Sequence, residues 1–409
     1  MGVRVRIRNA AVMLAVVFLL LGSGFGTSVS RRAAAKRHAA QKIVESARTQ
    51  RRIAHSSHSR RTARVVKVAR GRRARGRRHR YYEHFTGNSF VENDALTDGD
   101  VTTGEDPIVR AAAIDALGDM NGTAVAIDPS NGRILAMVNQ KLALSAGAMP
   151  CSTIKLSVAL AGLREGLITK DTMVNLGGWR MNLTQAIAKS NNVYFEVLGR
   201  RLGFDRVKHY ANEFGLGELA GYGIQGEHLG TYPDEVISQA EGGVGRMCSF
   251  GEGVNMTPLQ LGALTAAIAN GGTLYYLQHP TTPEEVVEFQ PRIKRTLPIG
   301  DVLPQMQDGM LGATSFGTAR SLRASFREMP ILGKTGTCSK DGMRFGWFTS
   351  YAETNYGRIV TVFFLEGGRP TFGPKAAELT GKFYRSLYDH SYFAVKANDS
   401  VRGAVGASQ

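Results

Sequence analysis

The chain has 409 residues and three cysteines, which allows one large domain or two ordinary ones and excludes a disulfide-rich scaffold. Its formal net charge of +17 belongs to one end: residues 1–80 hold 22 Lys and Arg against one acidic residue, whereas residues 81–409 hold 29 against 33. The globular part is therefore mildly acidic. We expect no nucleic-acid partner for the basic residues 31–80, because they include no aromatic residue for stacking on bases and are predicted below to lie outside the cytoplasm. No C-x-x-C or Cys/His spacing indicates a metal or cofactor.

Residues 1–30 are predicted to be a membrane anchor or signal segment. Arg4, Arg6 and Arg8 precede an uncharged run over residues 9–30, which as a helix would cover roughly 33 Å, about one hydrocarbon core. A single-pass anchor in the cytoplasmic (inner) membrane is favoured over a cleaved signal peptide. Both interpretations place the rest of the chain in the periplasm or outside the cell.

Residues 31–108 are predicted to be a basic linker followed by an acidic connector. Residues 31–80 contain no aromatic residue and few large apolar ones, so they cannot bury a core and we expect them to be disordered. One interpretation is a solvated spacer. The other is a segment that binds anionic lipid headgroups or acidic wall polymers.

Residues 109–395 carry the pattern of a folded domain, with a C-terminal tail at residues 396–409. A predicted helix begins near Val109, and "GTAVAIDPSNGRILAMV" predicts a β-hairpin. A helical block over residues 153–271 contains a helix that begins with Thr257 as N-cap and Pro258 at the first helical position. Three strand patterns and a terminal helix follow. We therefore predict an α+β fold with one antiparallel sheet covered by helices on both faces.

Three short motifs along this domain contain residues that could do chemistry. Ser152 precedes Lys155 by three residues at the start of a predicted helix, which places both side chains on one face. A lone S-x-x-K is expected about once by chance in a chain of this size, and Ser152 could simply be an N-cap. However, "KSNNVYF" supplies Ser190 and Asn192 between two helices, and "LGKTGTC" supplies Lys334 on an apolar strand. The ordered set of three motifs is much rarer than any one of them.

This set resembles the motifs of the penicillin-binding transpeptidases and the serine β-lactamases. Segments such as "AIAKSNNVYFEVLGRRLG" and "SFGEGVNMTPLQLGALTAAIANGG" extend the resemblance to the transpeptidase domain over residues 109–389. The resemblance implies a fold of this superfamily, with a helical subdomain beside the sheet.

The resemblance also implies a role for each side chain of the motifs. Ser152 would be the acylated nucleophile, and Lys155, kept neutral by burial beside Lys334, would accept its proton. Ser190 would relay a proton to the leaving amine, and Asn192 would hold the substrate amide. Lys334 would set the electrostatics around Ser190 and the substrate carboxylate.

The strand motif implies the remaining binding groups. Thr335 and Thr337, on either side of Gly336, would hydrogen-bond the substrate carboxylate. The backbone N–H groups of Ser152 and Thr337 would form the oxyanion hole. The implied reaction is acyl transfer from D-Ala-D-Ala stem peptides of peptidoglycan, as a DD-transpeptidase or a DD-carboxypeptidase, with β-lactam antibiotics acylating the same serine.

Two alternatives remain open from the sequence. A serine β-lactamase would need a glutamate after the S-x-N motif, and Glu227 lies in that interval, although "GEHLGTYP" lacks the E-x-x-L-N pattern. A non-catalytic β-lactam sensor would be acylated without turning over a peptide.

The cysteines give a further expectation by resemblance. Some class A β-lactamases link a cysteine before the nucleophile to one just after K-T-G, which corresponds to Cys151 and Cys338 here. Such a disulfide is feasible outside the cytoplasm, and the alternative is two small buried thiols. Cys248 would be the unpaired cysteine.

Overall fold

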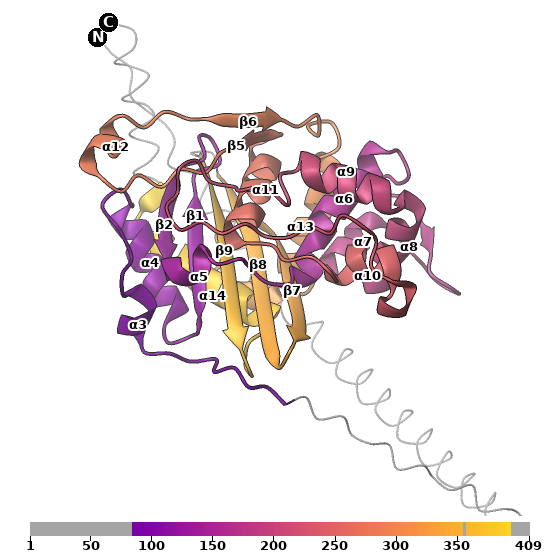
Figure 1. Ribbon diagram of the computed structural model, residues 1–409, viewed down its shortest axis with the longest axis horizontal. Coiled ribbons are helices and arrows are strands. Elements are labelled where there is room, and N and C mark those ends of the chain that lie inside the picture. Colours follow the sequence, from indigo (N-terminus) through magenta and orange to yellow (C-terminus); the bar gives the residue numbers. More distant parts are fainter. Residues whose placement is uncertain (1–83, 355–356, 394–409) are drawn as a thin grey trace, which may run out of the picture. The chain divides into compact units, whose positions relative to one another are not determined.

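The computed structural model describes residues 84–354 and 357–393 of the chain. Within them, five antiparallel strands form one sheet in the order β2-β1-β9-β8-β7 (Figure 1). Strand β7 is therefore an edge strand. The strands are β1 (Gly122–Ile127), β2 (Ile134–Val138), β7 (Ile331–Lys340), β8 (Met343–Thr354) and β9 (Gly357–Gly367).

Helices cover both faces of this sheet, because its strands are apolar on both sides. In β1, Val125 and Ile127 belong to the core shared with α11 (Pro258–Asn270), whereas Ala124 and Ala126 belong to the core shared with α4 (Pro107–Leu117) and α14 (Gly373–Asp389). The side chains of a strand alternate between its two faces, so one strand serves both cores. The predicted α+β sheet with helices on its two faces is confirmed.

Helix α11 begins and ends where its sequence predicts. The Thr257 side chain accepts a hydrogen bond from the Gln260 N–H in a capping box, and Pro258 occupies the first turn. At the other end Gly271 has a φ of 95°, the left-handed conformation that glycine adopts without strain. These signals set the ends of a helix that is buried almost throughout.

A helical lobe lies beside the β7 edge of the sheet (Figure 1). It does not run unbroken over residues 153–271. The hairpin of β3 (Val174–Asn175) and β4 (Arg180–Met181) interrupts it, as does the glycine-rich segment 214–242. Its helices are α6 (Lys155–Arg164), α7 (Leu183–Ala188), α8 (Asn192–Leu202), α9 (Phe204–Glu213), α10 (Gly243–Phe250) and α13 (Pro304–Ser315).

Short elements complete the described fold. They are α3 (Asn93–Thr97), α5 (Gln140–Ala143), η1 (Cys151–Ile154), η2 (Gln239–Glu241), β5 (Thr273–Tyr275), α12 (Pro283–Val287), β6 (Ile293–Thr296) and η3 (Arg320–Ala324).

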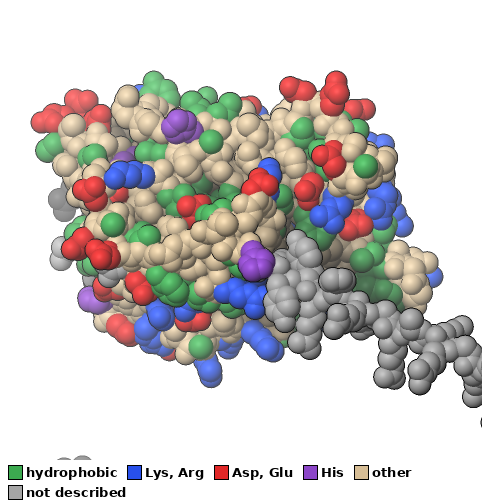
Figure 2. Space-filling model, turned by 60° about the horizontal axis from the view of Figure 1, so that its bottom comes forward, with side chains coloured by type: hydrophobic (Ala, Val, Ile, Leu, Met, Phe, Trp, Pro, Cys, Tyr) green, Lys and Arg blue, Asp and Glu red, His purple; other side chains and the backbone are tan. Residues whose placement is uncertain are grey.

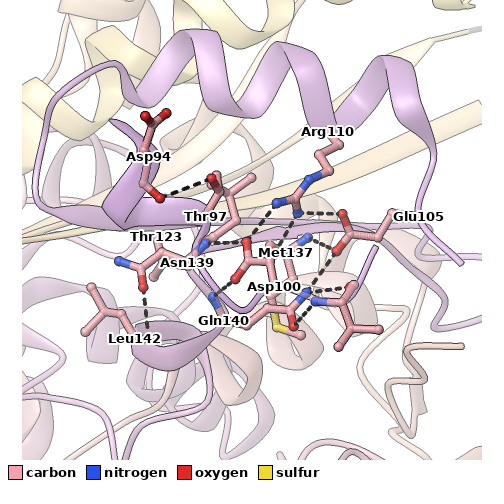
Figure 3. A network of polar contacts seen from close by, with 12 residues as sticks. Asp94, Thr97, Asp100, Glu105, Arg110, Thr123, Met137, Asn139, Gln140 and Leu142 are labelled. Carbon is pink, nitrogen blue, oxygen red and sulfur yellow. Dashed lines mark hydrogen bonds and ion pairs between the residues drawn. The ribbon is translucent and has the colours of Figure 1, made fainter. Parts of the chain in front are cut away.

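Residues 84–106, predicted as a polar connector, pack onto the domain. The carboxylates of Asp100 and Glu105 each lie 2.8 Å from the Arg110 guanidinium (Figure 3). Glu105 also lies 3.1 Å from His279. Asp100 further accepts the N–H groups of Asn139 and Gln140. The folded unit therefore begins upstream of the predicted start at residue 109.

The predicted membrane segment at residues 1–30, the basic segment 31–80 and the tail 396–409 lie outside the described residues. Among the helices that are described, none is long and apolar enough to cross a membrane. On the face drawn in Figure 2, acidic and basic side chains lie interspersed, in keeping with the mild charge of residues 81–409.

Candidate active site

Ser152 lies in the turn η1, directly before helix α6. The N-cap of η1 is Pro150 and that of α6 is Ile154, and neither has a side-chain cap, so the Ser152 hydroxyl does not serve as an N-cap. Thr153 holds the turn by donating its hydroxyl to the Pro150 carbonyl at 2.6 Å. The Ser152 Oγ atom lies 2.5 Å from the Nζ atom of Lys155, the first residue of α6. The i, i+3 spacing thus brings the two groups together.

The Lys155 amine has three hydrogen-bond partners. Besides Ser152, Nζ lies 2.8 Å from Asn192 Oδ1 and 2.7 Å from the Ser249 carbonyl oxygen. Both of these oxygens can only accept. A neutral amine has two N–H groups and one lone pair, so it satisfies both oxygens and accepts the Ser152 proton with the lone pair.

Burial and the nearby charge of Lys334 favour that neutral form. Lys155 is fully buried, and desolvation, followed by repulsion from Lys334, holds its pKa well below the ordinary value of lysine. Lys334 is buried as well, and burial lowers its pKa to about 7. Both lysines of the site therefore give up a proton more readily than an exposed lysine does.

The S-x-N segment presents one side chain to each lysine. Asn192 is the first residue of α8, whose N-cap is Asn191. The side-chain amide oxygen of Asn192 accepts a hydrogen bond from Lys155. Ser190 has a φ of 53° and receives a hydrogen bond from Lys334 Nζ at 2.7 Å. The left-handed conformation of Ser190 turns the chain between α7 and α8, so that residues two apart face different lysines.

The K-T-G strand packs directly against the turn that holds the nucleophile. A Cβ atom on Gly336 would lie 2.9 Å from the Pro150 carbonyl, so a larger residue would push the two segments apart. Trp347 of β8 donates its indole N–H to the Met149 carbonyl at 3.0 Å. Cys151 and Cys338 form a disulfide with a Cα–Cα distance of 5.5 Å. The close approach at Gly336, the Trp347 hydrogen bond and the disulfide therefore hold the paired strands β7 and β8 beside the turn of Ser152.

The two threonine hydroxyls of the strand motif have other partners. Thr335 Oγ1 lies 2.6 Å from the hydroxyl of Thr318, and Thr337 Oγ1 accepts the Gly373 N–H at 2.8 Å. Neither hydroxyl contacts Ser152 or Lys155 in the described structure. The site thus consists of a Ser152–Lys155–Asn192 cluster and a Ser190–Lys334 pair, flanked by these hydroxyls.

A comparison with known families agrees with this geometry. The family model for the penicillin binding protein transpeptidase domain matches residues 122–385, which include every motif residue above. The chain belongs to this family. Its transpeptidase domain therefore contains both the sheet and the helical lobe.

Curated relatives of this transpeptidase domain act in peptidoglycan and spore biology according to their names. The chain is 28% identical over 260 residues to the stage V sporulation protein D of Bacillus subtilis, covering 53% of this chain and 40% of that protein. It is 25% identical over 369 residues to the peptidoglycan D,D-transpeptidase MrdA of Acinetobacter baumannii, covering 71% of this chain and 53% of that protein. The chain thus spans about half or less of the length of these relatives.

Solved structures show the same fold. A chain from a structure described as the structural coordination of polymerization and crosslinking by a peptidoglycan synthase complex matches with a TM-score of 0.57 and 25% identity, covering 68% of this chain and 61% of that chain. The D,D-transpeptidase domain of a peptidoglycan glycosyltransferase from Eggerthella lenta matches with a TM-score of 0.54 and 19% identity, covering 69% of this chain and 81% of that chain. At that identity, the second match concerns the fold alone.

Two groups of the transpeptidase site were missed from the sequence. The first is the Ser249 carbonyl, a backbone atom in the last turn of α10 that no side-chain motif could reveal. The second is Thr318, which follows Gly317. A Cβ atom at Gly317 would lie 2.1 Å from the Ala188 carbonyl, and the Thr318 N–H donates to that carbonyl at 3.1 Å. The Gly317-Thr318 pair just after helix α13 is the sequence feature that could have indicated this close approach.

Glu227, considered above as a hydrolytic glutamate, has a different environment. Its carboxylate accepts hydrogen bonds from the N–H groups of Ala220 and Gly221, and burial raises its pKa. In the described part of the chain, no carboxylate hydrogen-bonds to Ser152 or Lys155, and no group of His, Cys, Asp and Glu could hold a metal ion.

Proposed function

We propose that the chain is a serine D,D-transpeptidase that acts on the D-Ala-D-Ala stem peptides of peptidoglycan and is acylated by β-lactams. The observation that carries this proposal is the Lys155 amine, 2.5 Å from Ser152 Oγ and bound by two groups that only accept hydrogen bonds. Because burial and the charge of Lys334 lower the pKa of this amine and favour its neutral form, its lone pair can accept the serine proton, and Lys155 then acts as a base toward the serine.

The acylation step follows from the two lysine-centred groups. Ser152 Oγ attacks the carbonyl carbon of the penultimate D-Ala as its proton passes to Lys155. The oxyanion that develops is held by the backbone N–H groups of Ser152 and Thr337. Ser190, which accepts a hydrogen bond from Lys334, passes a proton to the departing D-Ala amine as the C–N bond breaks.

Binding and the second step use the remaining residues. Asn192 orients the substrate amide. The hydroxyls of Thr335 and Thr337 keep accepting from Thr318 and from the Gly373 N–H and donate their own protons to the terminal carboxylate. The amine of a second stem peptide then attacks the acyl-enzyme and regenerates Ser152, which gives a cross-link. Attack by water instead gives the D,D-carboxypeptidase reaction.

The environment of Glu227 favours the transpeptidase over a serine β-lactamase. A deacylating glutamate must direct a water molecule at the acylated serine. The Glu227 carboxylate is instead occupied by two backbone N–H groups of its own loop. We therefore expect the penicilloyl-enzyme to be long-lived.

The cellular arrangement is part of the same proposal. Residues 1–30 anchor the chain in the cytoplasmic membrane, and the catalytic domain lies in the periplasm or outside the cell, where its disulfide is stable. Residues 31–80 bind anionic lipid headgroups or acidic wall polymers through their positive charge. In a form that lacks residues 1–30, further deletion of residues 31–80 should weaken binding to anionic vesicles or wall polymers and remove its dependence on salt; equal, salt-insensitive binding with and without residues 31–80 would refute this role.

The decisive experiment for the site is labelling with a fluorescent penicillin. Wild type and Ser145→Ala, a serine outside the motif whose hydroxyl bonds to Leu142, should be labelled, and Ser152→Ala should not. Lys155→Arg replaces the neutral amine by a guanidinium that stays protonated and cannot act as a base, so labelling should slow by roughly 100-fold or more. Labelling of Ser152→Ala at the wild-type rate would defeat the proposal.

The same label separates the three candidate functions. A transpeptidase or carboxypeptidase keeps the label for long times and releases D-Ala from a pentapeptide ending in D-Ala-D-Ala. A β-lactamase loses the label rapidly. A sensor keeps the label and releases no D-Ala.

A further inference from the structure

A cavity of about 460 Å³ lies away from the catalytic serine, and none of its lining residues belongs to the seryl site. Its walls come from the loop that carries Tyr222, from the β5–β6 connection that includes α12, and from the start of α5. The volume falls in the range of small-ligand sites in proteins. Neither the motifs nor the reaction proposed above accounts for it.

Two aromatic rings line this cavity, and an arginine packs on each. The Arg292 guanidinium lies 4.1 Å from the centre of the Tyr222 ring, and that of Arg133 lies 5.7 Å from the centre of the Phe289 ring. These cation–π contacts hold the rings in place at little entropic cost on binding. Tyr222 is nevertheless 51% exposed, so a ligand can still reach its ring.

Side-chain amides supply most of the neutral hydrogen-bonding groups. Gln225, Gln278 and Gln290 all line the cavity. Gln278 donates its NH₂ group to the backbone carbonyl of Gln290, while the side-chain amides of Gln225 and Gln290 make no hydrogen bond within the described residues. An amide both donates and accepts, so this wall matches hydroxyl and acetamido groups better than it matches an ion.

The charges around the cavity argue against an anionic ligand. Glu285 and Glu288 line it, and no lysine does. Of its cationic candidates, Arg292 is packed on Tyr222, and His279 is bonded to the buried Glu105 carboxylate. The lining thus sets two carboxylates against one guanidinium, that of Arg292, so its negative charge disfavours a polyanion, and the wall of side-chain amides favours an uncharged ligand.

We propose that this cavity binds a neutral, N-acetylated oligosaccharide. The apolar face of a sugar ring would stack on Tyr222, and its hydroxyl and acetamido groups would bond to the glutamine amides. That the natural ligand is the glycan strand bearing the stem peptides rests on the proposed function. On that basis, the cavity holds the polymer while Ser152 acts on its peptides.

The test uses the full chain and tetra-N-acetylchitotetraose as the probe, with binding followed by saturation-transfer NMR and calorimetry. We expect saturable binding with a Kd of about 0.1–1 mM, as for a small neutral ligand with one stacking contact. Tyr222→Ala should weaken binding tenfold or more, roughly 1.4 kcal/mol. Tyr222→Phe keeps the ring and should retain binding. Gln290→Ala should weaken binding by removing a side-chain amide, and this second variant still tests the proposal if Tyr222→Ala fails to fold.

The matched control is Tyr388→Ala. Tyr388 is 45% exposed and also lies near an arginine, Arg385, at 5.8 Å, but it is outside the cavity. Its loss should leave binding unchanged. No saturable binding up to roughly 10 mM, or equal binding by wild type and Tyr222→Ala, would overturn the inference. Penicillin labelling of the same samples reports on Ser152 alone, so failure of the reaction and failure of the sugar site are seen separately.

Discussion

The hydroxyl groups of Thr318 and Thr335 lie 2.6 Å apart, which joins the loop after α13 to the K-T-G strand. The Thr318 backbone N–H also donates to the carbonyl of Ala188, the last residue of α7. Thr318 therefore contacts both the strand that holds Lys334 and the helix end that leads to Ser190. The 2.7 Å contact between the Lys334 amine and the Ser190 hydroxyl depends on how this strand and this helix end are held relative to each other.

Removing this hydroxyl should slow acylation without unfolding the domain. Thr318→Val keeps the shape of the side chain but loses the bond to Thr335, and one such bond is worth about 1 kcal/mol, or roughly a fivefold to tenfold change in rate. Thr318→Ser should restore the wild-type rate of penicillin acylation. The control is Ser315→Ala, an exposed hydroxyl one turn earlier that bonds only to Leu311. Equal rates in Thr318→Val and Ser315→Ala would contradict a positioning role.

The burial of Lys334 should make the domain more stable as pH rises above neutrality. Burial lowers its pKa from 10.5 to about 7, so between these values the unfolded chain holds a proton that the folded chain lacks. The free energy of unfolding therefore increases with pH across this window and is lowest below pH 7. The slope approaches about 1.4 kcal/mol per pH unit, which gives roughly 2 kcal/mol between pH 7 and 9.

Urea unfolding of wild type and Lys334→Met at several pH values checks this prediction. The variant should lose the contribution of Lys334 and show a smaller rise, because the buried amine of Lys155, whose pKa is also lowered, still gives up its proton on folding. Lys170→Met is the control, since Lys170 is 46% exposed and forms only a surface ion pair with Asp308. Parallel pH profiles for wild type and Lys334→Met would show that Lys334 is not the group responsible.

The Cys151–Cys338 disulfide should contribute substantially to stability. It spans 187 residues of sequence, and the chain-entropy relation gives roughly 5 kcal/mol for closing a loop of that size. Cys151→Ser combined with Cys338→Ser should lower the free energy of unfolding and abolish its dependence on reductant. Cys248→Ala leaves the bridge intact and should stay as sensitive to reductant as wild type. Counting thiols in denaturant should give one before reduction and three after; three before reduction would contradict the bridge.

The ionic network around Arg110 should be essential for folding the start of the domain. Arg110→Met leaves Asp100 and Glu105 as buried carboxylates, with 2% and 1% of their side chains exposed, and should cost about 3–5 kcal/mol. Lys141→Met removes an exposed pair with Asp98 and should cost less than about 1 kcal/mol. Comparable melting temperatures for the two variants would mean that the network is dispensable.

Local sequence patterns were sufficient where one element carries the information. The helical spacing of Ser152 and Lys155 predicts their contact, and Thr257, Pro258 and Gly271 mark the ends of α11. Each of these signals lies within one helix or directly beside its ends, so no tertiary structure was needed to interpret it.

Contacts between distant segments could not be read in this way. Asp100 and Glu105 look like solvated acids in a polar stretch, because Arg110, a helical residue, and His279, 174 residues away from Glu105, give no local sign of pairing with them. The Ser249 carbonyl reaches Lys155 across 94 residues and belongs to the backbone, so residue types carry no trace of it. The left-handed φ of Ser190 is likewise imposed by the turn between two packed helices.

The bond between Cys151 and Cys338 closes a covalent ring that contains the whole catalytic motif, while strands β1, β2, β8 and β9 and helix α14 lie outside it. A protease that cuts once inside this ring opens it but releases no fragment, because both halves stay attached through the bridge. Nicked molecules therefore keep both halves of the catalytic machinery on one covalent body until a reductant reaches the sulfur atoms. The side chains kept together in this way are Ser152, Lys155, Ser190, Asn192 and Lys334.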